Sequence, residues 1–380
     1  MPLACLTLLV PELLWPEPED REALDPLACP ALAALLARGR FSRRPPRALE
    51  SVLVELSGQA AGVSCGALRR RGEAGVAGDD ATARWIAADP VNLRFHQQRL
   101  LLSDAATLAI APEEAAALVD ALNGYFAGLG VFHAASAERW YLRLAADKEN
   151  EGNEAVGALE RLDAPPLSAI AGRGVERWLG ELSGEREAFK LLNEIQTFLH
   201  AQPLNRRREK EGRPLVNSLW LWGGGTPPAA SVAASFDAAW SDDPLAVGLA
   251  RAAGAPAYPA PGGMANLLAQ AASATRPLAV LEDLGEAVRR EDGEAYRQSV
   301  AALEARWFAP AWRALARGVI GGLRLLAPTA YGVLRWDAGR AAPWRFWRRP
   351  QTLAATARAL AASATSATSA ASTTSAGDAA

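Results

Sequence analysis

One segment of the chain combines side chains and backbone features that could hold an anion. Asn205, Arg208 and Arg213 carry hydrogen-bond donors suited to a carboxylate or a phosphate. The glycine run Gly223–Gly225 follows soon after them, and glycine lets backbone N–H groups approach a ligand closely. Because no G-K-[ST] follows the glycines, the run is not a P-loop. These residues predict a site for an anionic small molecule, and a solvated basic loop that leads into a buried strand is the alternative.

The position of the glycines relative to a strand gives the predicted site its geometry. Residues Val216–Trp222 are mostly apolar and predict a buried strand. In a parallel sheet, ligands gather beyond the carboxyl ends of the strands. We therefore expect the amides of Gly223, Gly224 and Gly225 to line the pocket, and Asn217 to brace the loop.

The same segment resembles a motif of a known enzyme family. Its sequence, HAQPLNRRREKEGRPLVNSLWLWGGG, resembles the H-P-x-N-x-x-R-x-x-x-G-x-x-x-x-N-x-x-x-x-x-G-x-G motif of archaeal-type cofactor-independent phosphoglycerate mutases, which belong to the alkaline phosphatase superfamily. The matching positions are His200, Pro203 (displaced), Asn205, Arg208, Gly212, Asn217, Gly223 and Gly225. Degenerate bacterial relatives of these enzymes, often called regulatory proteins of the RpfE type, are the subgroup that this chain resembles.

Weaker similarities follow in the same order as in that family. Pro30–Gly39 resembles a helix near the start of the family, and Arg139–Leu144 resembles one of its strands. Ala88–Asp104 resembles a segment on the substrate side, which adds Asn92 and Arg94 to the predicted ligand-binding residues. The resemblance covers most of residues 1–350, and its specific part is residues 200–225.

The resemblance implies two-metal phosphoryl transfer, in which a serine nucleophile lies beside divalent ions held by Asp and His. This chain has three histidines, and residues 201–380, from which the family draws most of its ligands, contain none. The first strand leads into Glu12 instead of the family's Asp-Gly, and Ala327–Thr329 replaces an Asp-His turn. Ser51 is the nearest counterpart of the nucleophile, but the adjacent Asp is missing.

A site made of carboxylates alone could still hold Mg²⁺, which prefers oxygen ligands. The candidate ligands are Glu12, Glu50, Glu282, Asp283 and Glu286. Scattered acids mostly lie on protein surfaces, so we expect no metal site and no cofactor. The three histidines, His96, His133 and His200, have no metal-ligand spacing and are expected to make ordinary hydrogen bonds.

Retained substrate-like residues without metal ligands favour a non-catalytic, regulatory or binding protein that recognises a phosphorylated or carboxylated small molecule. Two alternatives stay open. One is an active 2,3-bisphosphoglycerate-independent phosphoglycerate mutase or phosphatase with an atypical site, and the other is a structural protein-interaction module.

Composition excludes several other classes of function. The formal net charge of −2 over 380 residues gives no bulk field for nucleic acid or an anionic membrane. Arginine makes up 37 of the 40 basic residues, a bias typical of GC-rich bacterial genomes, so that single arginines carry little weight. The cysteines number three and form no C-x-x-C motif, which favours a reducing cytoplasm. No apolar run reaches the ~18 residues that a membrane span needs.

An arginine- and tryptophan-rich stretch near the C-terminus is the second candidate for binding. In Arg335–Arg349, arginines alternate with aromatic residues, among them Trp344 and Trp347. Such a pattern suits single-stranded nucleic acid or a protein partner. Because no basic field extends beyond it, we expect packing of the tryptophans or a protein contact through Trp344 and Trp347, and not nucleic acid.

Strands and helices alternate along most of the chain, which predicts an α/β fold with a mostly parallel sheet and helices on both faces, as in alkaline phosphatase and phosphoglycerate mutase. We expect one domain over residues 1–352 and a disordered tail, rich in Ala, Ser and Thr, over residues 353–380. A frayed helix that reaches about Ala362 is the alternative for the start of the tail.

The expected strands are Leu3–Val10, Trp140–Leu144, Val216–Trp222, Pro277–Leu281, Val319–Leu326 and Val333–Trp336. The expected helices are Pro30–Arg38, Pro112–Leu129, Glu185–His200, Pro244–Ala253 and Glu286–Arg317, the last broken near Pro310, and Ala61–Asp80 is expected to be a loop.

Overall fold

The protein forms two compact units. The computed structural model describes residues 3–25, 27–74, 83–96, 99–145, 153–171, 175, 178, 185–229, 233–271 and 273–363. Unit 1 consists of Met1–Val52, Ser235–Asp242 and Ala255–Ala380, and unit 2 consists of Leu53–Ala234 and Asp243–Gly254. The residues 1–352 that the sequence predicted as one domain therefore contribute to two units.

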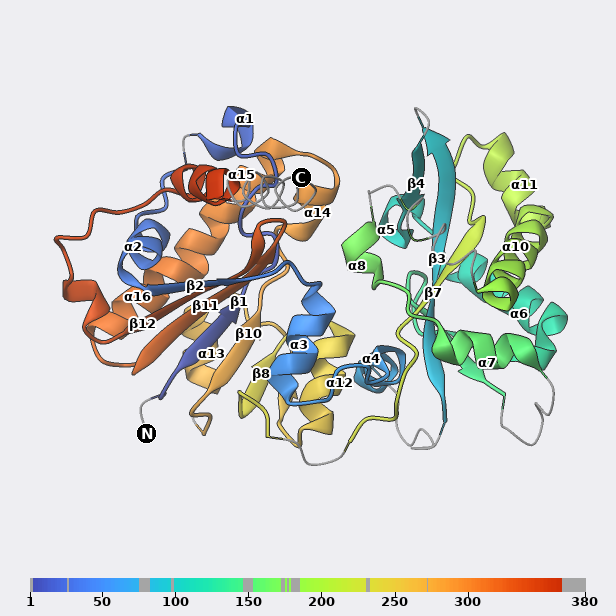
Figure 1. Cartoon of the computed structure of the whole chain (residues 1–380), viewed down its shortest axis with the longest axis horizontal. Coiled ribbons are helices and arrows are strands. Elements are labelled where there is room, and N and C mark those ends of the chain that lie inside the picture. Colours follow the sequence, from blue (N-terminus) through green and yellow to red (C-terminus); the bar gives the residue numbers. More distant parts are fainter. Residues whose placement is uncertain are drawn as a thin grey trace, which may run out of the picture. The chain divides into compact units, whose positions relative to one another are not determined.

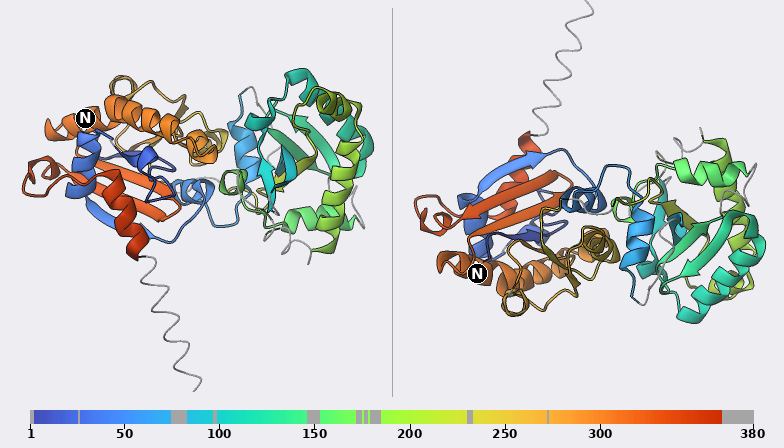
Figure 2. Two further views of the ribbon diagram at one scale, coloured as in Figure 1. Left: turned by 90° about the horizontal axis from the view of Figure 1, so that it is seen from above. Right: turned by 90° about the horizontal axis from the view of Figure 1, so that it is seen from below.

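Unit 1 is built on a seven-stranded sheet. In spatial order its strands are β2 (Arg40–Arg44), β12 (Gly332–Gly339), β11 (Gly322–Thr329), β1 (Leu6–Leu9), β10 (Pro277–Val280), β8 (Ala238–Trp240) and β9 (Ala257–Tyr258). From β11 to β9 all neighbours are parallel, and β12 and β2 add an antiparallel edge. The side chains of β1, β10 and β8 are all buried, as expected for parallel strands covered on both faces. Helices flank this sheet (Figures 1 and 2), which confirms the predicted α/β fold class.

The helices of unit 1 include α1 (Arg21–Leu24), α2 (Pro30–Arg38), α13 (Met264–Gln270), α14 (Gly285–Arg289), α15 (Gly293–Leu303), η3 (Glu304–Phe308), α16 (Ala309–Ala316) and η4 (Ala342–Trp344). Both predicted helices are among them, but the predicted Glu286–Arg317 is interrupted after α14, and α1, α13 and η4 were not predicted. The break predicted near Pro310 is the π-helical turn η3, which lies directly before α16. A proline has no N–H for the helical ladder, so a wider turn ahead of it keeps the helix continuous. Glu304 at the start of η3 is buried and accepts the Ala31 and Leu32 amides of α2 at 2.8 and 3.1 Å.

Residues 353–363, assigned to the disordered tail from composition, form a helix. Leu353, Ala354, Ala357 and Leu360 lie on one face of it and are buried in the large core of unit 1. Their spacing is that of an amphipathic helix, and alanine is small enough to let the helix pack closely. The helix agrees with the alternative that the sequence left open, a helix that reaches about Ala362, and the rest of the predicted tail lies outside the described residues.

Unit 2 is built on a second sheet in which every pairing is antiparallel. The strand order is β4 (Arg99–Ser103), β3 (Trp85–His96), β6 (Trp140–Leu144) and β5 (Gly130–Ala134), and β7 (Ser218–Trp222) also pairs with β3. The expected parallel setting of β7 is therefore wrong. All five side chains of β7 are buried, and a strand covered on both faces has the same apolar pattern in either kind of sheet.

Two helices of unit 2 replace loops that the sequence predicted. The helices of the unit include α4 (Cys65–Gly72), α5 (Ala105–Leu108), α6 (Pro112–Tyr125), η1 (Ala127–Leu129), α7 (Glu154–Arg161), α8 (Leu167–Ile170), α10 (Arg186–His200), α11 (Pro203–Lys210) and α12 (Pro244–Ala252). Helix α4 begins at Ser64, whose hydroxyl accepts the Ala67 amide at 3.1 Å, and α11 begins at Pro203. Serine at the N-cap and proline at the first helical position are start signals that the glycine and arginine content of these segments obscured. In the described part of the chain every helix is too short or too polar to span a bilayer.

The helix over residues 353–363 should contribute to the stability of unit 1. Truncation by Leu360→Ala removes a side chain that is 7% exposed and should lower the free energy of unfolding by about 2–5 kcal/mol. Urea denaturation measures this change. Arg358→Ala, an exposed position on the same helix, is the control and should change stability by less than about 0.5 kcal/mol. Equal stability of the Leu360→Ala and Arg358→Ala proteins would contradict the packing of this helix.

Candidate functional site

Arg208, the central cation of the predicted anion site, lies inside unit 2. Its side chain is 0% exposed, and its Nη1 donates to Glu114 Oε2 at 2.5 Å. Its Nε donates to the Pro214 carbonyl at 2.8 Å, and its Nη2 donates to the Leu108 carbonyl. Each nitrogen of the guanidinium thus has a partner within the unit, and the side chain joins α11 to α5 and α6.

Arg213 shares the same carboxylate. Its two terminal nitrogens each lie 3.0 Å from an oxygen of Glu114, and Nη2 also donates to the Ala109 carbonyl at 3.1 Å. Burial acts to raise the pKa of Glu114, but the Ala111 amide and the two arginines outweigh it and hold that pKa below its ordinary value. Glu114 therefore stays ionised and binds two cations at the start of α6.

The asparagines of the motif bind backbone atoms. Asn205 is 1% exposed, donates to the Leu199 and Val216 carbonyls at 2.7 and 2.8 Å, and accepts the Val216 amide at 2.9 Å. Asn217 exchanges two hydrogen bonds of 2.8 and 2.9 Å with the backbone of Leu93. These side chains align the chain before β7 with α10 and with β3.

Of the two residues that the resemblance added, only one joins this group. Asn92 is buried, and its Nδ2 donates to the Leu215 carbonyl at 2.9 Å. Arg94 lies further along β3 with an exposed side chain. The structure therefore brings the asparagines, Arg208 and Arg213 together around residues 213–217, with internal hydrogen-bond partners, and leaves Arg94 at the surface.

The glycine turn packs against another backbone segment. Gly223 has a φ of 73°, and its carbonyl accepts the Gly66 amide at 2.8 Å. A Cβ at Gly223 would lie 2.8 Å from that amide nitrogen, and a Cβ at Gly225, whose φ is 136°, would lie 2.2 Å from the Gly62 carbonyl oxygen. Gly224 lies between them, next to the carbonyls of Leu159 and Glu160. Close approach is the reason for glycine at these positions, as predicted, but the group that approaches is the start of α4.

A buried ion pair in unit 2 was missed by the sequence analysis. Arg69 of α4 donates to both oxygens of Asp89 on β3 at 3.0 and 2.7 Å, and Trp222 donates to Asp89 at 2.8 Å. The guanidinium also lies 5.4 Å from the ring centroid of Tyr141 and 5.5 Å from that of Trp222. Burial disfavours the charge on Arg69, but Asp89 outweighs it and raises the pKa of this arginine.

A second carboxylate, Glu73, extends this network. It accepts both Nε and Nη2 of Arg139 at 2.8 and 3.0 Å and the Tyr141 hydroxyl at 2.6 Å. Although burial opposes it, these donors lower the pKa of Glu73, and burial raises the pKa of Tyr141. Arg69 and Glu73 lie in the segment predicted as a loop, and the many arginines of the chain gave Arg69 no distinct signal.

The family's metal ligands would lie at the carboxyl edge of the parallel sheet in unit 1. There, the chain leaves β1 through Glu12, which has a left-handed backbone with a φ of 56° and donates its amide to Pro328 at 2.9 Å. Thr329, which replaces the histidine-bearing turn, is buried, and its hydroxyl donates to the Gly332 carbonyl at 2.9 Å.

Apolar and aromatic residues occupy the space beside these strand ends. Leu13 and Trp15 follow Glu12 and are buried in the core. The Tyr296 hydroxyl donates to the Leu13 carbonyl at 2.6 Å, and the Tyr331 hydroxyl lies 3.0 Å from the Trp15 carbonyl. Burial raises the pKa of both tyrosines, that of Tyr331 to about 12, so both stay neutral.

The remaining candidate ligands lie at separate positions. Among the described residues, no three His, Cys, Asp or Glu side chains are grouped so that they could hold a metal ion. Asp283 forms an ion pair with Arg306 at 2.7 Å, and Glu286 pairs with Arg290 at 2.8 Å on an exposed helix. Glu282 follows β10, and Glu50 and Ser51 lie on α3 (Leu49–Ser57). Of the histidines, His200 ends α10, His133 packs on Trp85 with ring centroids 5.1 Å apart, and the side chain of His96 is outside the described residues.

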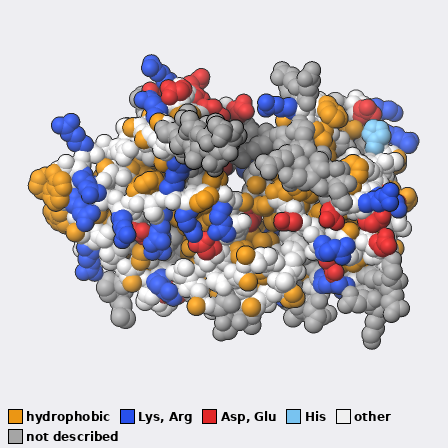
Figure 3. Space-filling model, in the orientation of Figure 1, with side chains coloured by type: hydrophobic (Ala, Val, Ile, Leu, Met, Phe, Trp, Pro, Cys, Tyr) orange, Lys and Arg blue, Asp and Glu red, His pale blue; other side chains and the backbone are white. Residues whose placement is uncertain are grey.

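The arginine- and tryptophan-rich stretch reaches the surface of unit 1. Trp344, Phe346 and Trp347 are 66%, 78% and 69% exposed in the loop after β12. Figure 3 shows one face of the molecule, on which hydrophobic side chains lie among charged ones. Trp336, which the sequence placed in the same stretch, is instead buried within β12.

Comparisons with known proteins support a relationship of limited extent. No protein-family model matches the chain. A segment of 63 residues is 36% identical to a probable 2,3-bisphosphoglycerate-independent phosphoglycerate mutase of Geobacter sulfurreducens, and it covers 17% of this chain and 16% of that protein. The matched segment is therefore a small part of either chain.

Solved structures resemble the chain over much more of its length. The PH0037 protein from Pyrococcus horikoshii matches 89% of this chain and 88% of its own, at 15% identity and a TM-score of 0.53. A cofactor-independent phosphoglycerate mutase from Thermoplasma acidophilum DSM 1728 covers 94% and 95% at 14% identity, with a TM-score of 0.46. At such identities the likeness to the Pyrococcus protein shows a shared fold.

Loss of Arg208 should unfold part of unit 2. Arg208→Ala leaves Glu114 without one of its cations and leaves two carbonyls without donors, and it should cost about 3–5 kcal/mol. Hydrogen–deuterium exchange of the backbone amides in α6 and α11 measures the loss of stability within unit 2. Arg206→Ala removes an exposed arginine from the same helix and should leave exchange unchanged. If the two variants exchange alike, Arg208 has no structural role.

The stability of unit 2 should fall in acid through Glu114. Its pKa is lower in the folded protein, so its contribution is complete above the unfolded value of about 4.3 and is lost as the pH falls through the folded pKa. Glu114→Gln should destabilise the unit at neutral pH and flatten the decline between about pH 5 and pH 3. Urea midpoints measured across this range test the expectation. Glu113→Gln, an exposed neighbour, should keep the wild-type slope, and an unchanged slope in Glu114→Gln would refute the assignment.

Proposed function

We propose that this chain is a phosphoglycerate mutase-like protein that binds an anionic small molecule and does not transfer phosphoryl groups. The observation that carries this proposal is the composition of the carboxyl edge of the parallel sheet. Two-metal catalysis needs oxygen or imidazole ligands that converge on a metal pair. At this edge the chain instead places Leu13, Trp15 and two neutral tyrosines next to Glu12.

The contacts made by the motif residues support the same proposal. In this chain the residues that resemble the mutase motif connect α6, α11 and β7 to one another. These contacts stabilise the fold whether or not a reaction takes place. A ligand role for Arg208 and Asn205 stays a prediction, and the internal partners of both side chains weigh against it.

An active mutase or phosphatase is the second candidate. The observation that favours it is the 36% identity over 63 residues with a probable phosphoglycerate mutase. Its acids would be Glu12, Glu282 and Asp283, with Ser51 as the nucleophile. This arrangement would require Mg²⁺ or Mn²⁺, because carboxylate oxygens are hard ligands.

A protein contact is an additional role that the surface suggests. Trp344, at the end of η4, and Trp347, in the segment after it, are both exposed, and tryptophan is enriched in interface hot spots. This contact would fit a regulatory protein, in which ligand binding is communicated to a partner.

Activity measurements separate binding from catalysis. The purified full chain, assayed for phosphoglycerate mutase and phosphatase activity with Mn²⁺, Mg²⁺ or Zn²⁺, should show no more turnover than the same protein in EDTA. A metal-dependent mutase in the same buffers is the positive control. In parallel, at least one compound in a panel of phosphorylated and carboxylated metabolites should raise Tm, because a ligand of the native state stabilises it by mass action.

Two results would overturn the proposal. Metal-dependent turnover that Ser51→Ala abolishes would establish the second candidate. A panel in which no anionic compound raises Tm would leave a structural protein-interaction module as the better account.

A further inference from the structure

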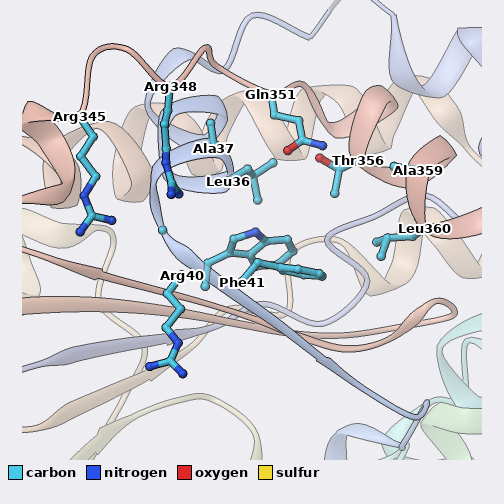
Figure 4. A pocket seen from close by; sticks show the side chains of 12 residues that line it. Leu36, Ala37, Arg40, Phe41, Arg345, Arg348, Gln351, Thr356, Ala359 and Leu360 are labelled. Carbon is cyan, nitrogen blue, oxygen red and sulfur yellow. The ribbon is translucent and has the colours of Figure 1, made fainter. Parts of the chain in front are cut away.

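Unit 1 contains a pocket outside the region that resembles the mutase motif. Its volume is about 590 Å³, within the range of small-molecule sites. It lies between the end of α2, the edge strand β2, the loop after β12 and the helix over residues 353–363. Figure 4 shows the side chains that line it, among them Leu36, Phe41, Arg345, Arg348, Gln351 and Leu360.

Aromatic and aliphatic side chains form one side of this pocket. Phe41 and Trp336 face each other across β2 and β12, with ring centroids 5.1 Å apart. Trp336 is 2% exposed and fixed in the core, whereas Phe41 is 44% exposed and accessible to a ligand. Leu36 and Leu360 continue this apolar wall. A flat apolar group can therefore lie against Phe41 and bury surface there.

Two arginines supply positive charge on the opposite side. Arg345 and Arg348 lie on one turn, in which the Arg348 amide donates to the Arg345 carbonyl at 3.0 Å. Both side chains extend from the loop in the same direction, and that of Arg348 reaches toward Phe41 (Figure 4). Among the described residues no carboxylate forms an ion pair with either, and none of the residues named as lining the pocket is acidic.

Arg40 provides an internal comparison. It also borders the pocket, but its side chain points away from Phe41 (Figure 4). Side chains alternate between the faces of a strand, so neighbours such as Arg40 and Phe41 point to opposite sides. Arg40 thus adds charge nearby without facing a ligand that lies on Phe41.

We infer that this pocket binds a small molecule that joins a flat aromatic group to a phosphate or carboxylate. The aromatic group lies on Phe41, and the anion receives charge-assisted hydrogen bonds from Arg345 and Arg348. The side-chain amide of Gln351 lies at the same pocket and adds a polar contact. The inference deepens the proposed binding function and rests on it for the expectation that the chain has a ligand.

Phenyl phosphate is a minimal probe for this site. Calorimetric titration of the full chain should show that it binds at least about tenfold more tightly than inorganic phosphate or phenol, since each of these offers one of the two contacts. The double variant Arg345→Ala/Arg348→Ala should weaken binding of phenyl phosphate at least about tenfold, and Phe41→Ala should also weaken it. Added salt should weaken binding to the wild type more than binding to the double variant.

Matched variants keep this test specific. Arg40→Ala removes one positive charge from the rim of the pocket and should weaken binding much less than Arg348→Ala, which removes one charge from the side chain that reaches toward Phe41. Ala359→Trp fills the pocket from the helix over residues 353–363 and should abolish binding without changing any charge. All of these substitutions affect exposed or half-buried positions, and far-UV circular dichroism checks that each variant is folded.

Failure of this inference differs from failure of the proposed function. No binding of phenyl phosphate, or equal effects of Arg40→Ala and the double variant, would overturn the inference about the pocket. The proposal that the chain does not transfer phosphoryl groups would still stand. Metal-dependent turnover would overturn the proposed function, and a pocket that still bound phenyl phosphate would then be a second site.

Discussion

The carboxylate of Glu114 is the contact on which the arrangement of unit 2 depends most. It accepts the Ala111 amide at the start of α6 and binds both Arg208 and Arg213. Arg208 also binds the carbonyls of Leu108 and Pro214, so that one buried cluster fixes α5, α6, α11 and the entry to β7. A buried charge is costly unless it is paired, and removal of one partner is therefore worse than replacement of the whole cluster by apolar residues. This asymmetry explains how such residues can persist without a ligand.

The sequence allowed the identity of these residues to be predicted but not their partners. Asn205, Arg208 and Arg213 were predicted as donors for an anion; in the structure the two arginines share Glu114, and Asn205 binds the backbone of Leu199 and Val216. The sequence does not distinguish a side-chain donor that binds a backbone carbonyl from one that binds a phosphate. Every residue has a backbone carbonyl, so this kind of acceptor leaves no signal in the sequence. Likewise, the glycines at 223 and 225 indicate close approach, but the sequence does not show that the Gly62–Gly66 backbone is what approaches. For Arg69, which pairs with Asp89, the abundance of arginine removed the signal altogether.

The fold was predictable where one periodicity dominated. Helices α2, α6, α10 and α12 and strands β6 and β10 were found close to their bounds, because their apolar spacing is clear and because α2, α6, α12 and β10 also start at a proline. Two features were not predictable from local pattern. The antiparallel setting of β7 is decided by its pairing with β3, and the division into two units depends on contacts distant in sequence.

The filled carboxyl edge has a consequence for where this chain can bind a ligand. In parallel α/β sheets that edge is the usual site, because loops leave a crevice there. Here Leu13 and Trp15 are buried in the core just after β1, and the hydroxyls of Tyr296 and Tyr331 bind their carbonyls. A pocket of about 590 Å³ in unit 1 lies instead at the antiparallel edge, where β12 and β2 extend the sheet beyond the parallel strands. The loop after β12 places arginines opposite Phe41 at that edge. Arg348 is exposed and Arg345 is half-buried, with a single backbone contact of 3.4 Å to the Arg38 carbonyl, and among the described residues neither pairs with a carboxylate, as a site for an anion requires.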